Sequence, residues 1–272
     1  MIEKPSQIRC KPLLGTFVEI KVFSKNSVAY LAVEKAFDEI AKIHNLMSFF
    51  NEKSEVSKLN REAHKQSVGV ERRLFEVLIL AQKLFKISDG IFDVSLHRSQ
   101  KNSSFAHIEL GENYQVKFKQ NLQIDLGGIA KGYAVDAAAK ILENHGVLNY
   151  IINAGGDLRV GKLPQKIGIR NPKKPGEIIC KTEICNRSLA TTSGYFSCQK
   201  IGKKTIYPIF QPGLGALEYD NESVSVSCES CAISDALTKI VAIKKEDSAE
   251  ILQQFGAQAM LVSSTNQVSF LN

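Results

Sequence analysis

Charged residues lie beside a glycine turn in the segment QIDLGGIAKGYAVD, which spans residues 123–136. Asp125 precedes the pair Gly127–Gly128, and Lys131 falls in the first turn of the helix that the pattern predicts next. Glycines let a backbone approach a ligand closely, and a helix N-terminus offers free N–H groups to an anion. The segment is therefore typical of a phosphate site, with a turn carbonyl available to a hard cation. Equally, Asp125 could simply cap the helix.

A second glycine pair occurs in NYIINAGGDLRVG, where Asp157 follows Gly155 and Gly156 directly after an apolar strand. A strand that ends in small residues and a carboxylate suits an edge facing a ligand. The same pattern also suits a plain β-bulge.

A third candidate is Asp235 in SCAISDALTK, an apolar segment predicted to be helical. A carboxylate buried there needs a partner or a metal, because an unpaired buried charge is costly. Thr238 follows one turn later, and carboxylate, hydroxyl and carbonyl oxygens are the ligands that Mg²⁺ accepts. The competing interpretation is an exposed aspartate at the start of the helix.

Three further features carry less information. GIFDV with Asp93 and LATTSGY with Ser193 and Gly194 are short polar elements at strand ends. Cys228 and Cys231 form a CxxC without a second cysteine pair or a histidine pair at zinc-finger spacing. They are interpreted as two buried thiols.

The composition is that of an ordinary globular protein, with 272 residues, 44% hydrophobic and 23% charged. The net charge of +7 comes from basic residues scattered among 28 acidic ones, which argues against nucleic-acid binding. The N-terminus carries no apolar targeting core and no membrane span. We expect a cytoplasmic protein from the chain as given, although a trimmed exported protein would look the same.

Periodicity and turn residues outline the elements that must position these groups. Long amphipathic helices are predicted over residues 27–47, 70–88, 130–145, 231–243 and 247–255, with a short helix capped by Ser54. Strands are predicted over residues 17–23, 91–96, 106–110, 115–119, 150–152, 259–263 and 267–271, with others between 152 and 226. From its composition, the polar run at residues 98–104 is predicted to be a flexible tract. Mixed hairpins and long helices indicate an α+β fold.

Seven segments in this order resemble the FAD:protein FMN transferase family, the ApbE-type flavin transferases. They are LLGTFVEI, MSFFNEKSEVSKLN, GIFDVS, IDLGGIAKGYAVD, NYIINAGGDLRVG, LATTSGY and SVSVSCESCAISDAL. The resemblance runs from residue 13 to about 243. It implies a single domain over residues 1–272, with mixed sheets and flanking helices in a fold related to the T-fold. The domain would have two intertwined α+β lobes that the sequence does not separate.

The resemblance also implies a reaction. Relatives split FAD in a Mg²⁺-dependent step and move FMN onto a threonine or serine hydroxyl of an acceptor protein, releasing AMP. The catalytic residues would be Lys131, Asp235 and Lys239, and the metal ligands the Gly128 carbonyl, Asp235 and Thr238. FAD would contact Leu14, Phe50, Ile91, Phe92, Asp93, Asp125, Lys131, Asp157, Ser193, Gly194 and Ile209.

The chain departs from the family pattern in two places. Active relatives carry a late segment with a histidine, an aspartate and a threonine, where this chain has YPIFQPGLG with Pro208, Gln211 and Leu214. The threonine expected four residues after Asp235 is Lys239, an amine that could displace the metal or bind phosphate itself. The alternatives to a transferase are therefore an FAD-binding protein without transfer activity and an FAD pyrophosphatase.

Overall fold

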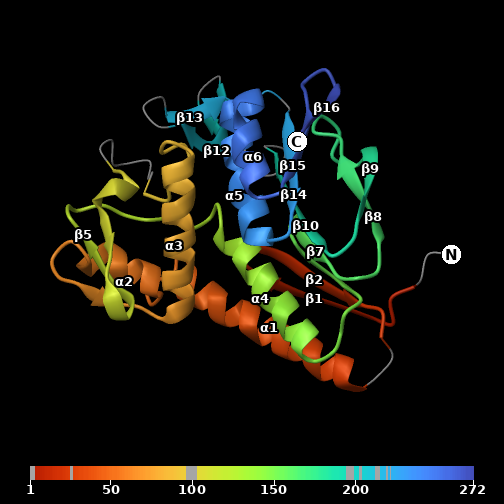
Figure 1. The fold of residues 1–272 in the computed structure, drawn as a ribbon, viewed down its shortest axis with the longest axis horizontal. Coiled ribbons are helices and arrows are strands. Elements are labelled where there is room, and N and C mark those ends of the chain that lie inside the picture. The colour runs from red at the N-terminus through yellow and green to blue at the C-terminus, as the bar shows by residue number, and fades with distance from the viewer. Residues whose placement is uncertain are drawn as a thin grey trace.

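The computed structural model describes residues 4–24, 27–95, 103–193, 199–201, 204–211, 215–218, 220 and 222–272. Helices and antiparallel sheets are both present, so the predicted α+β class is confirmed. Figure 1 shows a large sheet with helices α1, α4 and α5 lying across it, and a smaller lobe around α2, α3 and β5 to one side.

The large sheet has eight strands in the order β1-β2-β6-β7-β10-β14-β15-β16, and each neighbouring pair is antiparallel. The strands are β1 (Gln7–Leu13), β2 (Thr16–Val22), β6 (Tyr150–Ala154), β7 (Asp157–Val160), β10 (Arg187–Ser193), β14 (Ser223–Cys228), β15 (Gln258–Val262) and β16 (Val268–Leu271). Because the pairs are antiparallel, the start of β2, the end of β6 and the start of β7 meet at one end of the sheet.

Alternating side chains give the sheet two buried faces. On one face lie α1 (Ser27–Met47), α4 (Ala130–Asn144), α5 (Cys231–Lys244) and α6 (Ala249–Gln254). Ile152 of β6 joins this helical core, whereas its neighbour Ile151 packs with a smaller cluster on the other face. A hairpin of β8 (Gln165–Arg170) and β9 (Ile178–Ile184) covers that second cluster.

The smaller lobe combines two helices with a three-stranded sheet and shares the helical core. Its elements are α2 (Glu55–Glu62), β3 (Val68–Gly69), α3 (Arg72–Ile87), β4 (Ile108–Leu110) and β5 (Gln115–Phe118). A further sheet consists of β11 (Gln199–Ile201), β12 (Lys204–Gln211) and β13 (Gly215–Glu218). Among the described residues, no helix has both the length and the apolar character that crossing a bilayer requires.

Several local predictions are confirmed. The helix over residues 27–47 has the predicted bounds, and the Ser54 hydroxyl caps α2 by accepting from the Ser57 N–H at 3.0 Å. Gly90 and Gly146 follow α3 and α4 with φ of +80° and +74°, values that favour glycine. The predicted hairpin is formed by β4 and β5.

Other local predictions are wrong. No strand forms over residues 91–95, where the Phe92 N–H bonds to the Ser88 hydroxyl and Asp93 accepts from the Ser95 N–H and hydroxyl. These side-chain bonds occupy backbone donors that a strand would pair with a neighbour. Residue 96 and most of the predicted tract 98–104 lie outside the described residues. The helix predicted from residue 247 begins as a 3₁₀ turn, and α6 starts only at Ala249.

Candidate functional site

The first turn of the chain lies against the second glycine pair. β2 pairs with β6 from Val18↔Ala154 onward, which brings the Leu14–Gly15 turn beside the Gly155–Gly156 turn. A Cβ atom on Gly155, whose φ is +67°, would lie 2.5 Å from the Thr16 hydroxyl oxygen. Only glycine fits there, and the Gly155 backbone therefore packs directly against the Thr16 side chain.

The residue 91–95 segment runs beside the first glycine pair. The Asp125 N–H donates to the Val94 carbonyl at 2.8 Å. A Cβ atom on Gly128 would lie 3.5 Å from the Phe92 ring and 3.6 Å from Cε of Lys239. The diglycine turn is therefore placed between an aromatic ring and the lysine of a distant helix.

A cluster of opposite charges lies at the start of α4. The Lys131 ammonium is 3.0 Å from the Asp157 Oδ2, 3.5 Å from the Asp235 Oδ2 and 3.3 Å from the Gly127 carbonyl oxygen. Asp157 and Asp235 are almost fully buried. Because the Gly127 carbonyl and the Asp235 carboxylate both contact this ammonium, the diglycine turn and the late helix do converge.

Lys239 approaches the same carboxylate from the other side. Its ammonium donates to the Asp235 Oδ1 and, at 2.8 Å, to the Asp235 main-chain carbonyl. The Gly132 N–H donates to the Asp235 Oδ2 at 3.4 Å. Both oxygens of the Asp235 carboxylate are therefore engaged by groups of this chain.

Burial and pairing act in opposite directions on these groups. Burial alone would raise the pKa of Asp235, but the nearby charges of Lys131 and Lys239 outweigh it and lower the pKa. Burial and the negative charge of Asp235 together raise the pKa of Asp157. Burial would lower the pKa of Lys131, but Asp157 and Asp235 raise it. Asp235 is therefore ionised between two ammonium groups.

Close packing of α4 on α5 sets this geometry. A Cβ atom on Gly132 would lie 2.3 Å from the Cys231 carbonyl oxygen and 2.7 Å from the Ala232 Cα. Asp136, one turn later, accepts from the N–H groups of Cys231 and Ala232 at 2.9 and 3.0 Å, and from the Ser230 hydroxyl at 2.7 Å. A carboxylate at a helix N-terminus satisfies unpaired donors and complements the helix dipole. Asp136 thereby fixes the start of the helix that carries Asp235.

Asp136 and Asn60 also support the site, although no pattern in the sequence marked them as candidates. The Asn60 amide donates to the Ile124 carbonyl at 3.1 Å, and its Oδ1 accepts from the Ile124 N–H at 2.8 Å. It therefore holds the strand-like stretch that leads into the diglycine turn. Their bonding partners are 64 and about 95 positions away in the chain, so local spacing could not reveal these contacts. The only signal in the sequence was that both residues lie inside segments that resemble the transferase family.

The predicted Mg²⁺ ligands do not fit a metal ion in this arrangement. The Thr238 hydroxyl is buried and donates at 2.7 Å to the main-chain carbonyl of Asp235, within its own helix. The Asp235 carboxylate contacts two ammonium groups, which would repel a dication beside it. Within the described ranges, no cluster of three or more His, Cys, Asp or Glu residues could hold a metal.

Three predicted FAD contacts lie in different settings. Asp125 is exposed, and its carboxylate accepts from the Gly127 N–H at 2.9 Å, so it caps the turn rather than the helix. Asp93 also accepts from the Phe105 N–H at 3.0 Å and thus organises its own loop. Phe50 is 90% exposed, with its ring edge-on to Phe49. A large exposed ring is compatible with stacking on a ligand.

The remaining predicted contacts lie on strands or their ends. The Ser193 hydroxyl, at the end of β10, donates to the Glu222 carbonyl at 3.3 Å. Ile209 belongs to β12. Gly194 and the positions 212–214 of the departing segment lie outside the described residues. The Cys228 and Cys231 thiols are free and buried, as predicted.

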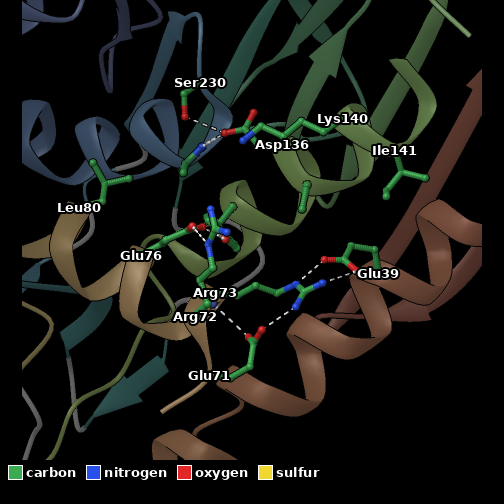
Figure 2. Close-up of a pocket in the computed structure, with 13 residues that line it drawn as sticks. Glu39, Glu71, Arg72, Arg73, Glu76, Leu80, Asp136, Lys140, Ile141 and Ser230 are labelled. Atoms are coloured by element: carbon green, nitrogen blue, oxygen red, sulfur yellow. Dashed lines mark hydrogen bonds and ion pairs between the residues drawn. The ribbon is translucent and has the colours of Figure 1, made fainter. Parts of the chain in front are cut away.

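A separate cavity of about 450 Å³ opens between α1, α3, α4 and the start of α5 (Figure 2). None of the residues predicted to bind FAD lines it. Arg73 bridges Glu39 and Glu71 there, and Arg72 pairs with Glu76. Neither of the two glycine pairs, which would let a diphosphate approach the backbone, lines this cavity.

Curated relatives share most of this chain. The chain is 28% identical over 246 residues to the FAD:protein FMN transferase of Chlamydia muridarum, covering 79% of this chain and 75% of the relative. It is 24% identical over 308 residues to the enzyme of the same name from Vibrio cholerae, covering 99% and 88%.

Two solved structures of ApbE proteins have the same fold as this chain. The crystal structure of the ApbE protein from Thermotoga maritima matches with a TM-score of 0.85 at 24% identity, covering 98% of this chain and 97% of that one. The flavin transferase ApbE from Vibrio cholerae matches with a TM-score of 0.81 at 20% identity, covering 97% and 96%. The family model described as "ApbE family" matches residues 14–101 and 96–261. This chain belongs to the ApbE family.

Proposed function

We propose that this protein is an FAD:protein FMN transferase, which moves the FMN part of FAD onto a serine or threonine hydroxyl of an acceptor protein and releases AMP. The curated relatives above carry this transferase name, and none carries a name that favours an inactive binder or a pyrophosphatase. The observation that carries the proposal is the cluster of Lys131, Lys239, Asp157 and Asp235 beside a diglycine turn.

The reaction breaks one phosphoanhydride bond. The acceptor hydroxyl oxygen attacks the phosphorus on the riboflavin side of FAD, and a new phosphoester bond forms. The bond from that phosphorus to the bridging oxygen breaks, and the bridging oxygen leaves as part of AMP. The hydroxyl proton passes to a base or to solvent, which balances the step.

Electrostatic stabilisation is the contribution that this chain makes. Phosphoryl transfer depends on positioning and on positive charge at the phosphoryl oxygens and the leaving oxygen. Lys131 and Lys239 supply that charge from fixed positions, since Asp157 and Asp235 hold them. The glycine turn lets the diphosphate approach the backbone, and Leu14, Phe50, Ile91, Phe92 and Asp125 are proposed to contact the rest of FAD. No step runs through Mg²⁺, because the predicted ligands do not fit it.

The test is incubation with FAD and a candidate acceptor protein, read by intact mass for the gain of one FMN and by chromatography for AMP. We expect both products with the wild type and a loss of about 100-fold in rate for Lys131→Met, as for the removal of one stabilising charge. Lys140→Met, which removes an exposed lysine from the same helix, is the matched control. AMP without a mass gain would indicate a pyrophosphatase, and FAD binding with neither product would indicate a binder; either result would refute the proposal.

A further inference from the structure

Lys239 stands at the position where the family resemblance expects a threonine ligand of the metal. Its ammonium lies one helical turn after Asp235 and donates to both the carboxylate and the main-chain carbonyl of that residue. Its side chain is 21% exposed, so a ligand can reach it. The end of the side chain also passes close to Gly128, where the diphosphate would approach.

We propose that the Lys239 ammonium serves in this protein as the permanent cation at the diphosphate, and that FAD binding needs no divalent metal. The inference rests on the proposed function, because it concerns the same site. It assigns Lys239 as the residue that determines whether the site is metal-dependent.

Charge repulsion opposes the binding of a metal ion to the Asp235 carboxylate. Mg²⁺ coordinates oxygen at about 2.0–2.1 Å and requires nearly octahedral geometry. An ion bound to the Asp235 carboxylate would face the Lys239 ammonium on one oxygen and the Lys131 ammonium on the other. In a partly buried site the repulsion between such charges is only weakly screened. The carboxylate therefore accommodates either the two ammonium groups or a metal, but not both.

The two lysines differ in how many of their ammonium protons are already bonded to the protein. Lys131 contacts three protein oxygens, which matches its three ammonium protons. Lys239 makes two such bonds among the described residues, both to Asp235. Counted over the described part of the chain, one proton of Lys239 remains for a phosphate oxygen, and a lysine binds phosphate as a compact point charge.

Thr238 supports the same conclusion. Its hydroxyl donates to the carbonyl three residues earlier and is fully buried, so it is not open to an ion that enters the site. At the position one residue later, where the family resemblance expects a threonine ligand, this chain carries the amine instead. Asp235 is thus the only side chain of the predicted ligand set that faces the cluster.

The experiment measures metal and FAD binding separately. Binding of Mn²⁺ alone is followed by electron paramagnetic resonance, and binding of FAD by flavin fluorescence, in EDTA and in excess Mg²⁺. The variants are Lys239→Thr, Lys239→Arg, which keeps the charge, and Lys244→Thr, a control on the same helix. Thermal unfolding of each variant confirms that it folds.

For the wild type we expect no Mn²⁺ binding and an FAD affinity that changes less than about twofold between EDTA and Mg²⁺. Lys239→Thr should bind FAD about 10- to 100-fold more weakly in EDTA, as for the loss of one charge-assisted hydrogen bond. It should also bind Mn²⁺, and Mg²⁺ should restore its FAD affinity. Lys239→Arg and Lys244→Thr should stay metal-independent.

The inference is overturned if Mg²⁺ tightens FAD binding to the wild type about tenfold or more, or if Lys239→Thr keeps full affinity in EDTA. Mn²⁺ binding to the wild type that Asp235→Asn abolishes would overturn it as well. If the wild type binds no FAD in either buffer, the proposed function fails, while the Mn²⁺ comparison still decides the role of Lys239. If transfer occurs only with Mg²⁺, the function stands and the inference fails.

Discussion

Replacing Gly132 by alanine tests whether the contact between α4 and α5 positions the charged cluster. The new Cβ atom would lie 2.3 Å from the Cys231 carbonyl oxygen and 2.6 Å from its carbonyl carbon. These atoms are backbone at the start of α5 and cannot rotate away. The two helices must therefore separate by roughly 1 Å before the contact becomes an ordinary one.

The expected loss of stability follows from two opposing terms. Overpacking of a buried contact costs about 1–3 kcal/mol, and a backbone clash belongs at the upper end. Alanine regains about 1 kcal/mol in helix propensity over glycine inside a helix. The net loss is about 2 kcal/mol, which lowers Tm by roughly 4–8 °C in a protein of this size.

The separation should also weaken the site. The Gly132 N–H and the Lys131 ammonium contact the Asp235 Oδ2 at 3.4 and 3.5 Å, near the limit of a hydrogen bond. A further shift breaks both contacts, and we expect FAD affinity to fall about tenfold.

Thermal unfolding by circular dichroism and an FAD titration measure the two effects. Gly176→Ala is the control, because it has no atom within 4 Å of the new Cβ and no positive φ, so its stability should change by less than about 0.5 kcal/mol. A Gly132→Ala protein with the Tm and FAD affinity of the Gly176→Ala control would refute the reasoning.

Two further changes test residues that hold the site from a distance. Asn60→Ala leaves the Ile124 N–H and carbonyl without their partner, so the free energy of unfolding measured in urea should fall by about 1–3 kcal/mol. An unchanged unfolding midpoint would show that water replaces the amide. Asp136→Asn removes the charge and replaces one acceptor oxygen of the α5 cap by an amide group that cannot accept from an N–H. We therefore expect a loss of about 1–3 kcal/mol, of which the charge-dependent part shrinks in high salt; a loss of the same size at all salt concentrations would argue against the helix-dipole contribution.

The sequence by itself determined the features that depend on neighbours along the chain. Apolar spacing gave the bounds of α1, and Ser54 marked the start of α2, because caps and helical stripes depend on residues a few positions apart. The α+β class followed from the same patterns. Charged residues beside glycine turns identified Lys131 and Asp157 as candidates, and a carboxylate inside an apolar helix identified Asp235. These three residues do meet.

Only the tertiary structure decided how those residues are paired. The sequence left open whether Asp235 has a charged partner or a metal, and the fold gives it two ammonium groups. Lys239 lies one turn later on the same helix, and the packing of α4 on α5 at Gly132 brings Lys131 to the other carboxylate oxygen. Likewise, the segment at residues 91–96 suggested a strand, but Ser88 and Asp93 bond its backbone locally within residues 91–95. Lys131 and Asp235 are 104 positions apart, so only the packing of distant helices decides that these two charges meet.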